Sequence, residues 1–155
     1  MANPTTRLLW WALVVSQVAY LAVACLVKLP PGDDDLIRIL ALSFALLSAA
    51  TAAGSILYRR VALVGPIRSW TLDPSNPEDF QKLYPRLLLN LVLAESVGIH
   101  GLVLSLMSGR VHFSLAFGTA ALALLYVHRP TALDLVPPLG GPRAGLGGEP
   151  PARPW

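Results

Sequence analysis

The sequence has little cysteine and little charge, and both shortages narrow what this chain of 155 residues can be. Its single cysteine, Cys25, excludes an internal disulfide and a zinc or iron–sulfur site built from several cysteines. Charged residues make up 14% of the chain, whereas a soluble domain carries about 25%. Because 54% of the residues are hydrophobic, lipid is the expected solvent for most of the chain.

Signals for soluble-type chemistry are also missing. The net charge of +3 comes from basic residues that flank apolar runs and do not cluster with aromatic residues, so no nucleic-acid partner is expected. No phosphate-binding glycine loop is present, nor a nucleophile with a recognisable base. One histidine at mid-helix, His100, has no second ligand at metal spacing, and we favour a helix contact for it over a metal or haem site. We therefore predict neither an enzyme nor a bound cofactor.

Long apolar runs are what the sequence does contain. A helix needs about 20 apolar residues to cross a hydrocarbon core of about 30 Å. Four runs approach or reach that length, at residues 8–27, 36–58, 87–107 and 111–127. The predicted fold is an all-α integral membrane bundle of four transmembrane helices, formed by residues 1–136. Residues 137–155 are rich in proline and glycine and are expected to be a disordered tail.

The basic residues predict the orientation of these spans. With the N-terminus inside, nine Lys and Arg residues fall on the inner side and three on the outer side, the latter being Lys28, Arg38 and Arg110. This bias predicts that both termini are cytoplasmic, in a multi-pass protein of a bacterial inner membrane. The second and third runs are joined by a long connection, residues 59–86. Within it, Asn76 can cap a helix that starts at Pro77, and we expect Pro77–Tyr84 to lie on the membrane surface.

The first run leaves an alternative open. Ala22-Val23-Ala24-Cys25 approaches a lipoprotein cleavage box, in which Cys25 would be lipidated and three spans would remain. The run is longer than the 7–15 residues typical of a signal region. We therefore favour an uncleaved first helix.

The third run contains one carboxyl group, Glu95, as its ninth residue. At a rise of about 1.5 Å per residue, Glu95 lies roughly 12 Å into a path of about 30 Å. A charged residue at mid-depth costs about 2.5–3.5 kcal/mol on insertion scales. Protonation avoids part of this cost, because an apolar surrounding disfavours the charged form.

Small residues accompany Glu95 on its helix. Gly98 shares its face, and Gly101 and Ser105 continue one edge of that face. The preceding run offers small residues as well, among them Ser48, Thr51 and Gly54. Because small residues let two backbones approach closely in lipid, the second and third spans are expected to form a tight antiparallel hairpin.

Two hypotheses for Glu95 follow from its depth. In the first, the carboxyl binds or passes a proton or another monovalent cation. In the second, it only fixes helix packing, through a hydrogen bond to a neighbouring helix; the candidate partners are Gln17, Ser43, Ser48 and Thr51.

Residues 93–105 read Leu-Ala-Glu-Ser-Val-Gly-Ile-His-Gly-Leu-Val-Leu-Ser. This stretch resembles the ion-carrying helix of the proteolipid c subunits of rotary ATP synthases and vacuolar-type ATPases. The resemblance implies that Glu95 is an ion-binding carboxyl in a helical hairpin and that the protein forms a homo-oligomer or joins a membrane complex. The alternative is a structural or assembly protein of the membrane without transport.

Overall fold

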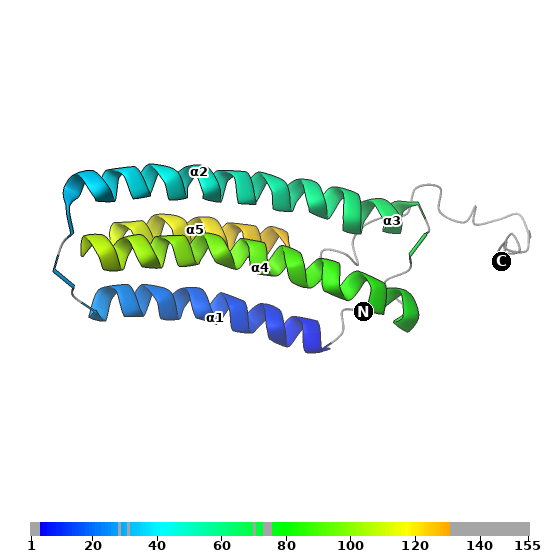
Figure 1. Cartoon of the computed structure of the whole chain (residues 1–155). Coiled ribbons are helices and arrows are strands. Elements are labelled where there is room, and N and C mark those ends of the chain that lie inside the picture. The colour runs from blue at the N-terminus through cyan, green and yellow to red at the C-terminus, as the bar shows by residue number, and fades with distance from the viewer. Residues whose placement is uncertain (1–3, 28, 31, 70, 73–75, 131–155) are drawn as a thin grey trace, which may run out of the picture.

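The computed structural model describes residues 4–27, 29–30, 32–69, 71–72 and 76–130. The predicted disordered tail, residues 137–155, lies outside these ranges. The fold is all-α, with four helices running along one another (Figure 1). They are α1 (Pro4–Leu26), α2 (Asp34–Tyr58), α4 (Pro77–Ser108) and α5 (His112–Val127).

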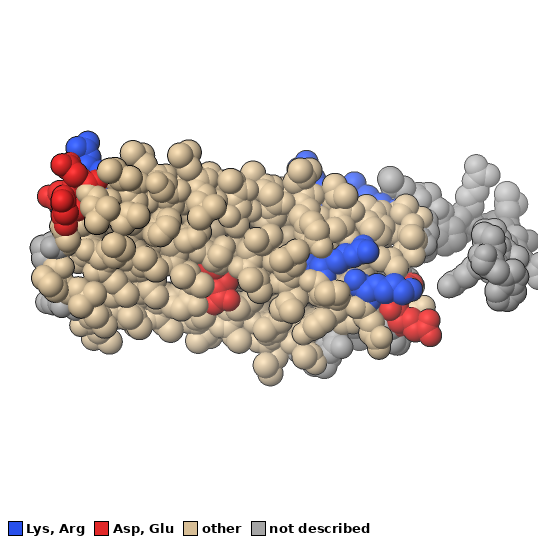
Figure 2. Space-filling model, in the orientation of Figure 1, with Lys and Arg blue, Asp and Glu red and all other residues tan. Residues whose placement is uncertain are grey.

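Three of the described helices are long and apolar enough to cross a membrane. These are Thr5–Leu26, Asp34–Arg68 and Glu78–Ser108, whereas His112–Val127 is a shorter apolar helix. The start of α1 and the end of α5 lie at the same end of the bundle (Figure 1). On the face in Figure 2, charged side chains gather towards the two ends and leave a largely uncharged stretch between them.

The second helix continues further than the sequence predicted. After α2 the chain forms a π-helical segment, η1 (Arg59–Val64), and then α3 (Gly65–Arg68). Pro66 has no N–H to donate to the carbonyl of Ala62 four residues earlier. That carbonyl accepts a hydrogen bond of 3.0 Å from Arg86 Nη1 on α4. A side chain of α4 therefore supports the place where the α-helical ladder of the second helix changes.

Pro77–Tyr84 is helical, as the sequence predicted, and forms the first two turns of α4, continuous with the third apolar run. The Asn76 side chain caps these turns, accepting from Glu78 N at 3.0 Å. Pro85 removes one backbone donor, yet the helix continues through it. Leu83 and Leu87, on either side of Pro85, are both buried in the core, and this packing holds the helix together across the proline.

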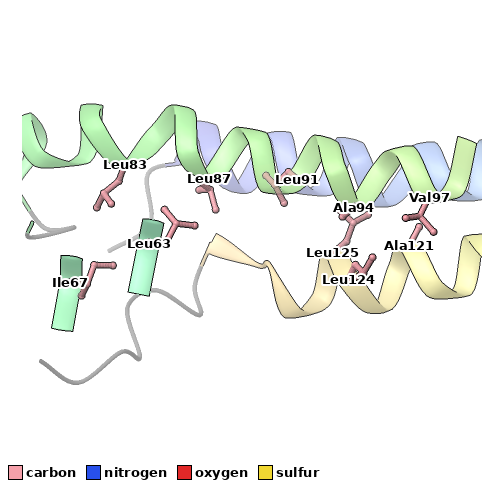
Figure 3. Close-up of a cluster of buried hydrophobic side chains, with 10 residues drawn as sticks. All are labelled: Leu63, Ile67, Leu83, Leu87, Leu91, Ala94, Val97, Ala121, Leu124 and Leu125. Atoms are coloured by element: carbon pink, nitrogen blue, oxygen red, sulfur yellow. The ribbon is translucent and has the colours of Figure 1, made fainter. Parts of the chain in front are cut away.

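The core follows one face of α4. Leu83, Leu87, Leu91, Ala94 and Val97 recur every three or four residues and point towards Leu63, Ile67 and the α5 residues Ala121, Leu124 and Leu125 (Figure 3). This helix contacts α1, α2 and α5, and its most extensive contacts are with α5. Large apolar side chains on the outer faces of α1 and α2 remain exposed, as expected for surfaces that meet lipid.

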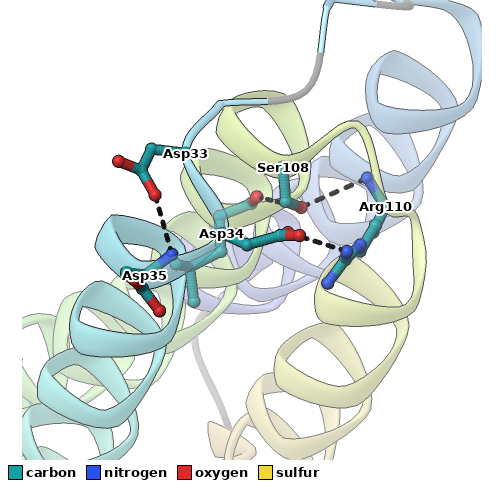
Figure 4. A network of polar contacts seen from close by, with 6 residues as sticks. Asp33, Asp34, Asp35, Ser108 and Arg110 are labelled. Atoms are coloured by element: carbon teal, nitrogen blue, oxygen red, sulfur yellow. Dashed lines mark hydrogen bonds and ion pairs between the residues drawn. The ribbon is translucent and has the colours of Figure 1, made fainter.

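Polar contacts close the bundle where α2 begins and α4 turns into α5 (Figure 4). Asp33 caps α2 by accepting from Asp35 N at 2.9 Å. Gly109 ends α4 with a φ of 66°, a left-handed conformation that glycine adopts at little cost. Arg110 Nη2 then pairs with Asp34 Oδ1 at 2.9 Å. The start of α2 is thus tied to the α4–α5 turn.

Candidate functional site

Glu95 is the nineteenth of the 32 residues of α4, so it lies far from both helix ends. It is half-buried and faces α1. Figure 2 shows one acidic patch midway along an otherwise uncharged stretch of the bundle. Glu95 therefore lies between two long apolar helices, α1 and α4, and far from the ends of α4.

Two hydroxyl groups of α1 donate to the same oxygen of this carboxyl. Ser16 Oγ lies 2.7 Å from Glu95 Oε1, and the Tyr20 hydroxyl lies 2.8 Å from it. Ser16 and Tyr20 are four residues apart and so share one face of α1. Within the described ranges, no Lys or Arg side chain forms an ion pair with Glu95. The charge of an ionised Glu95 is therefore met by neutral donors.

The Ser16 hydroxyl has a second acceptor. Its Oγ lies 2.7 Å from the carbonyl oxygen of Leu13 as well as 2.7 Å from Glu95 Oε1. A serine hydroxyl carries one hydrogen and can also accept. When Glu95 is ionised, Ser16 can donate to it; when Glu95 is protonated, Glu95 can donate to Ser16 while Ser16 donates to Leu13. The site offers a hydrogen-bonded arrangement for both forms of the carboxyl.

These partners differ from those proposed from the sequence. Ser48 instead lies 2.8 Å from His100 Nδ1, so that pair joins α2 to α4 away from the carboxyl. Gln17 is on the expected neighbouring helix, but neither of its side-chain polar atoms has a hydrogen-bond partner among the described residues. Ser16 and Tyr20 were both missed, and the available signal was their spacing of one turn on the first apolar run.

The small residues near Glu95 lie against α1 and α5, not against α2. At Gly98, an added Cβ would meet the Gln17 side chain, and at Gly101 it would meet Phe117 Cβ at 2.5 Å. Ser105 Oγ accepts from Ser114 N at 2.7 Å, which ties α4 to α5.

On the second span, Thr51 is half-buried, and a Cβ at Gly54 would meet nothing within 4 Å. The expected hairpin partners α2 and α4 are in contact, but the glycines of α4 serve other interfaces.

Two histidines connect α2 to the other helices. The His100 ring stacks on Phe44, with centroids 5.0 Å apart, in addition to its bond with Ser48. His128, just beyond α5, is buried and places Nε2 3.2 Å from Ser55 Oγ. Burial, together with the nearby charge of Arg59, lowers the pKa of His128 from 6.5 to about 4. His128 is therefore neutral near pH 7 and acts as a hydrogen-bonding side chain.

In the described part of the chain, no three His, Cys, Asp or Glu side chains lie close enough together to bind a metal ion. Cys25 is exposed near the end of α1, and the helix runs unbroken through Ala22–Cys25. The chemistry that the bundle does assemble is a hydrogen-bonded carboxyl between α1 and α4. Comparisons with protein-family models, with curated proteins and with solved structures gave no match to this chain.

Proposed function

We propose that the protein is a small multi-pass membrane protein whose bundle binds a proton at Glu95. The three long apolar helices support insertion in a bilayer. The shorter α5 would complete a fourth crossing, with both termini on the cytoplasmic side of a bacterial inner membrane. The excess of Lys and Arg on the side of the termini supports this orientation.

The proton-binding proposal rests on one observation: the Ser16 hydroxyl has two acceptors, Glu95 Oε1 and the Leu13 carbonyl oxygen. Since Ser16 Oγ is 2.7 Å from both Glu95 Oε1 and the Leu13 carbonyl oxygen, gain of a proton reverses one hydrogen bond and breaks none. Tyr20 also fits both forms, because its hydroxyl can donate to Oε1 or accept from it. A site of this kind can change its protonation state without repacking α1 against α4.

The resemblance to the proteolipid ion-carrying helix supports the same residue. The hydroxyl partners, however, come from α1, which lies outside the α2–α4 hairpin that the resemblance covers. We therefore propose that Glu95 binds a proton as the carboxyl of a proteolipid does, and we do not propose that the protein is part of a rotor ring. A monovalent cation is the competing ligand, because Glu95, Ser16, Tyr20 and the Leu13 carbonyl are all oxygen groups.

A second function is favoured by the origin of these donors. Both hydroxyls belong to the same chain as Glu95, so the contact also locks α1 onto α4. In that case the protein would be a structural or assembly component of the membrane, and protonation of Glu95 would have no role.

Labelling with dicyclohexylcarbodiimide (DCCD) distinguishes the two functions, since this reagent reacts with protonated carboxyl groups in lipid. The wild-type protein in lipid nanodiscs is expected to be labelled at Glu95, less so as the pH rises, and Glu95→Gln is expected not to react. Protection by Na⁺ at constant pH would identify a cation site. Absence of labelling at every pH, with Glu95→Gln disrupting helix association, would favour the structural function.

A further inference from the structure

A small cavity lies between α1 and α5. Its volume is about 80 Å³, and its lining includes Gln17 and Ser114 together with Gly118. Val18 and Leu122 form part of its apolar rim, and both are exposed on the bundle surface. Three polar residues, Gln17, Ser114 and Thr119, therefore lie in the lining of an otherwise apolar cavity that opens between exposed apolar side chains.

Two of the three polar residues that line this cavity have side-chain atoms without hydrogen-bond partners among the described residues, and the third, Thr119, donates to the Leu115 carbonyl. Both side-chain atoms of the Gln17 amide and the hydroxyl of Ser114 are buried and unpaired within the described ranges. Each of these two residues is only 4% exposed. Buried amides and hydroxyls are nearly always satisfied, because leaving them unpaired is costly. A lipid acyl chain could cover the mouth but could not supply these hydrogen bonds.

Water has the chemistry and the size that the cavity requires. A water molecule both donates and accepts, as the Gln17 amide and the Ser114 hydroxyl together demand. It takes up about 30 Å³ in the liquid, so a cavity of about 80 Å³ has room for about two water molecules. Buried water makes about three hydrogen bonds in proteins, and the two amide atoms of Gln17 with the hydroxyl of Ser114 offer three partners.

The cavity is close to Glu95. The Gln17 amide lies against Gly98, one helical turn beyond Glu95 on α4, and Gln17 follows Ser16 directly on α1. Positions one turn apart on the surface of a helix lie about 5–6 Å from each other. The polar lining of the cavity therefore begins near the carboxyl.

Polar groups continue from the cavity to one end of the bundle. The N–H of Ser114 donates to Ser105 Oγ at 2.7 Å. Further along, Ser108 Oγ accepts from Arg110 N at 3.2 Å, beside the pair of Arg110 with Asp34 (Figure 4). Buried serines and the exposed Asp34–Arg110 pair thus mark a polar route through an otherwise apolar interface.

We propose that this cavity is a buried water site through which Glu95 exchanges its proton with solvent at the Asp34–Arg110 end of the bundle. The water site itself stands on the unpaired atoms of Gln17 and Ser114. The role in proton exchange rests on the function proposed above for Glu95.

Radiolytic footprinting tests the water site, because hydroxyl radicals formed from bound water modify the side chains beside it. The wild-type protein in lipid nanodiscs should be modified at Val18 and Leu122. Leu42 and Leu46, which are exposed residues of α2 and do not line the cavity, should remain unmodified and serve as the reference. Equal modification of both sets, or of neither, would overturn the water site.

Filling the cavity supplies a matched control. A Cβ at Gly118 or at Gly54 would meet nothing within 4 Å, yet only Gly118 lines the cavity. Gly118→Leu should therefore abolish modification of Leu122, whereas Gly54→Leu should preserve it. Retention of the signal in Gly118→Leu would contradict the assignment. Gln17→Leu, which keeps the volume but removes the amide, should also lose the signal.

The proton route has its own readout. Hydrogen–deuterium exchange of the Glu95 carboxyl, followed by infrared spectroscopy, should slow in Gly118→Leu and keep the wild-type rate in Gly54→Leu. Equal exchange rates in the two variants would overturn the route. DCCD reaches Glu95 from lipid, so its labelling should persist in Gly118→Leu. Failure of labelling in the wild type would reject the proposed function, and the footprint would still decide the water site independently.

Discussion

Replacing Gly101 with alanine tests the packing that positions α4 against α5. The added Cβ would lie 2.5 Å from Phe117 Cβ and 2.9 Å from the carbonyl oxygen of Phe113. Favourable contacts between carbon atoms lie at about 3.5–4.0 Å. One contact is to a backbone atom and the other to a Cβ, so no change of side-chain rotamer relieves them. The two helices would have to separate by roughly 1 Å.

Overpacking of this kind costs about 1–3 kcal/mol. Alanine recovers at most about 1 kcal/mol through its higher helix propensity. We therefore expect Gly101→Ala to lower the free energy of unfolding by about 1–2 kcal/mol. Gly54→Ala is the matched control, since its Cβ would meet nothing within 4 Å. It should be neutral or slightly stabilising.

The assay is unfolding in mild detergent by titration with SDS, followed by circular dichroism. Each variant is compared with the wild type at the same detergent concentration. If Gly101→Ala proved as stable as Gly54→Ala, the close approach of α4 and α5 would be refuted. Gly98→Ala should cost less than Gly101→Ala, because its Cβ would meet only the flexible side chain of Gln17.

Three further predictions use the same unfolding assay. The pKa of His128 falls from 6.5 to about 4 on folding, so the unfolded chain binds more protons below about pH 6.5. Stability should therefore decrease by up to about 3 kcal/mol as the pH falls from 6.5 towards 4, at about 1.4 kcal/mol per pKa unit; a His128→Gln variant with the same pH dependence as the wild type would contradict this. Trp10→Phe removes the bond from Nε1 to the Leu125 carbonyl at 2.8 Å and should cost about 1 kcal/mol; an unchanged midpoint would show that this bond contributes nothing. Asp34→Asn breaks the ion pair with Arg110, in which the Asp34 side chain is 73% exposed and the Arg110 side chain 51% exposed. The change should lower the free energy of unfolding by less than about 1 kcal/mol, and by nothing in high salt. A larger loss that does not depend on salt would show that the pair is shielded from solvent.

The helices themselves were largely predictable from the sequence, because long apolar runs between charged segments are a strong indication of membrane-spanning helices. All four predicted runs correspond to helices. The end of the second helix was predicted less accurately, because Arg59 and Arg60 suggested that the helix ends before them. The chain instead continues to Arg68, where buried Leu63 and Ile67 pack against α4.

The position of Glu95 was also predictable, but its partners were not. In lipid, the surface that faces another helix and the surface that faces acyl chains are both apolar, so hydrophobic periodicity does not reveal which helices pair. Small residues suggested that α2 would face Glu95. The structure places Ser16 and Tyr20 of α1 there instead. Gly98 and Gly101 likewise face α1 and α5. A glycine in the sequence indicates that another helix approaches closely, but it does not indicate which helix.

An infrared titration of the protein in lipid tests most directly whether Glu95 gains and loses a proton within the α1–α4 interface. We expect a protonated-carboxyl band that changes with pH in the wild type and is absent from Glu95→Gln. The band should shift in frequency in Ser16→Ala and Tyr20→Phe, because each variant loses a hydrogen-bond partner of Glu95. A band that survives in Glu95→Gln, or a wild-type spectrum that does not change with pH, would show that Glu95 does not bind a proton in this interface.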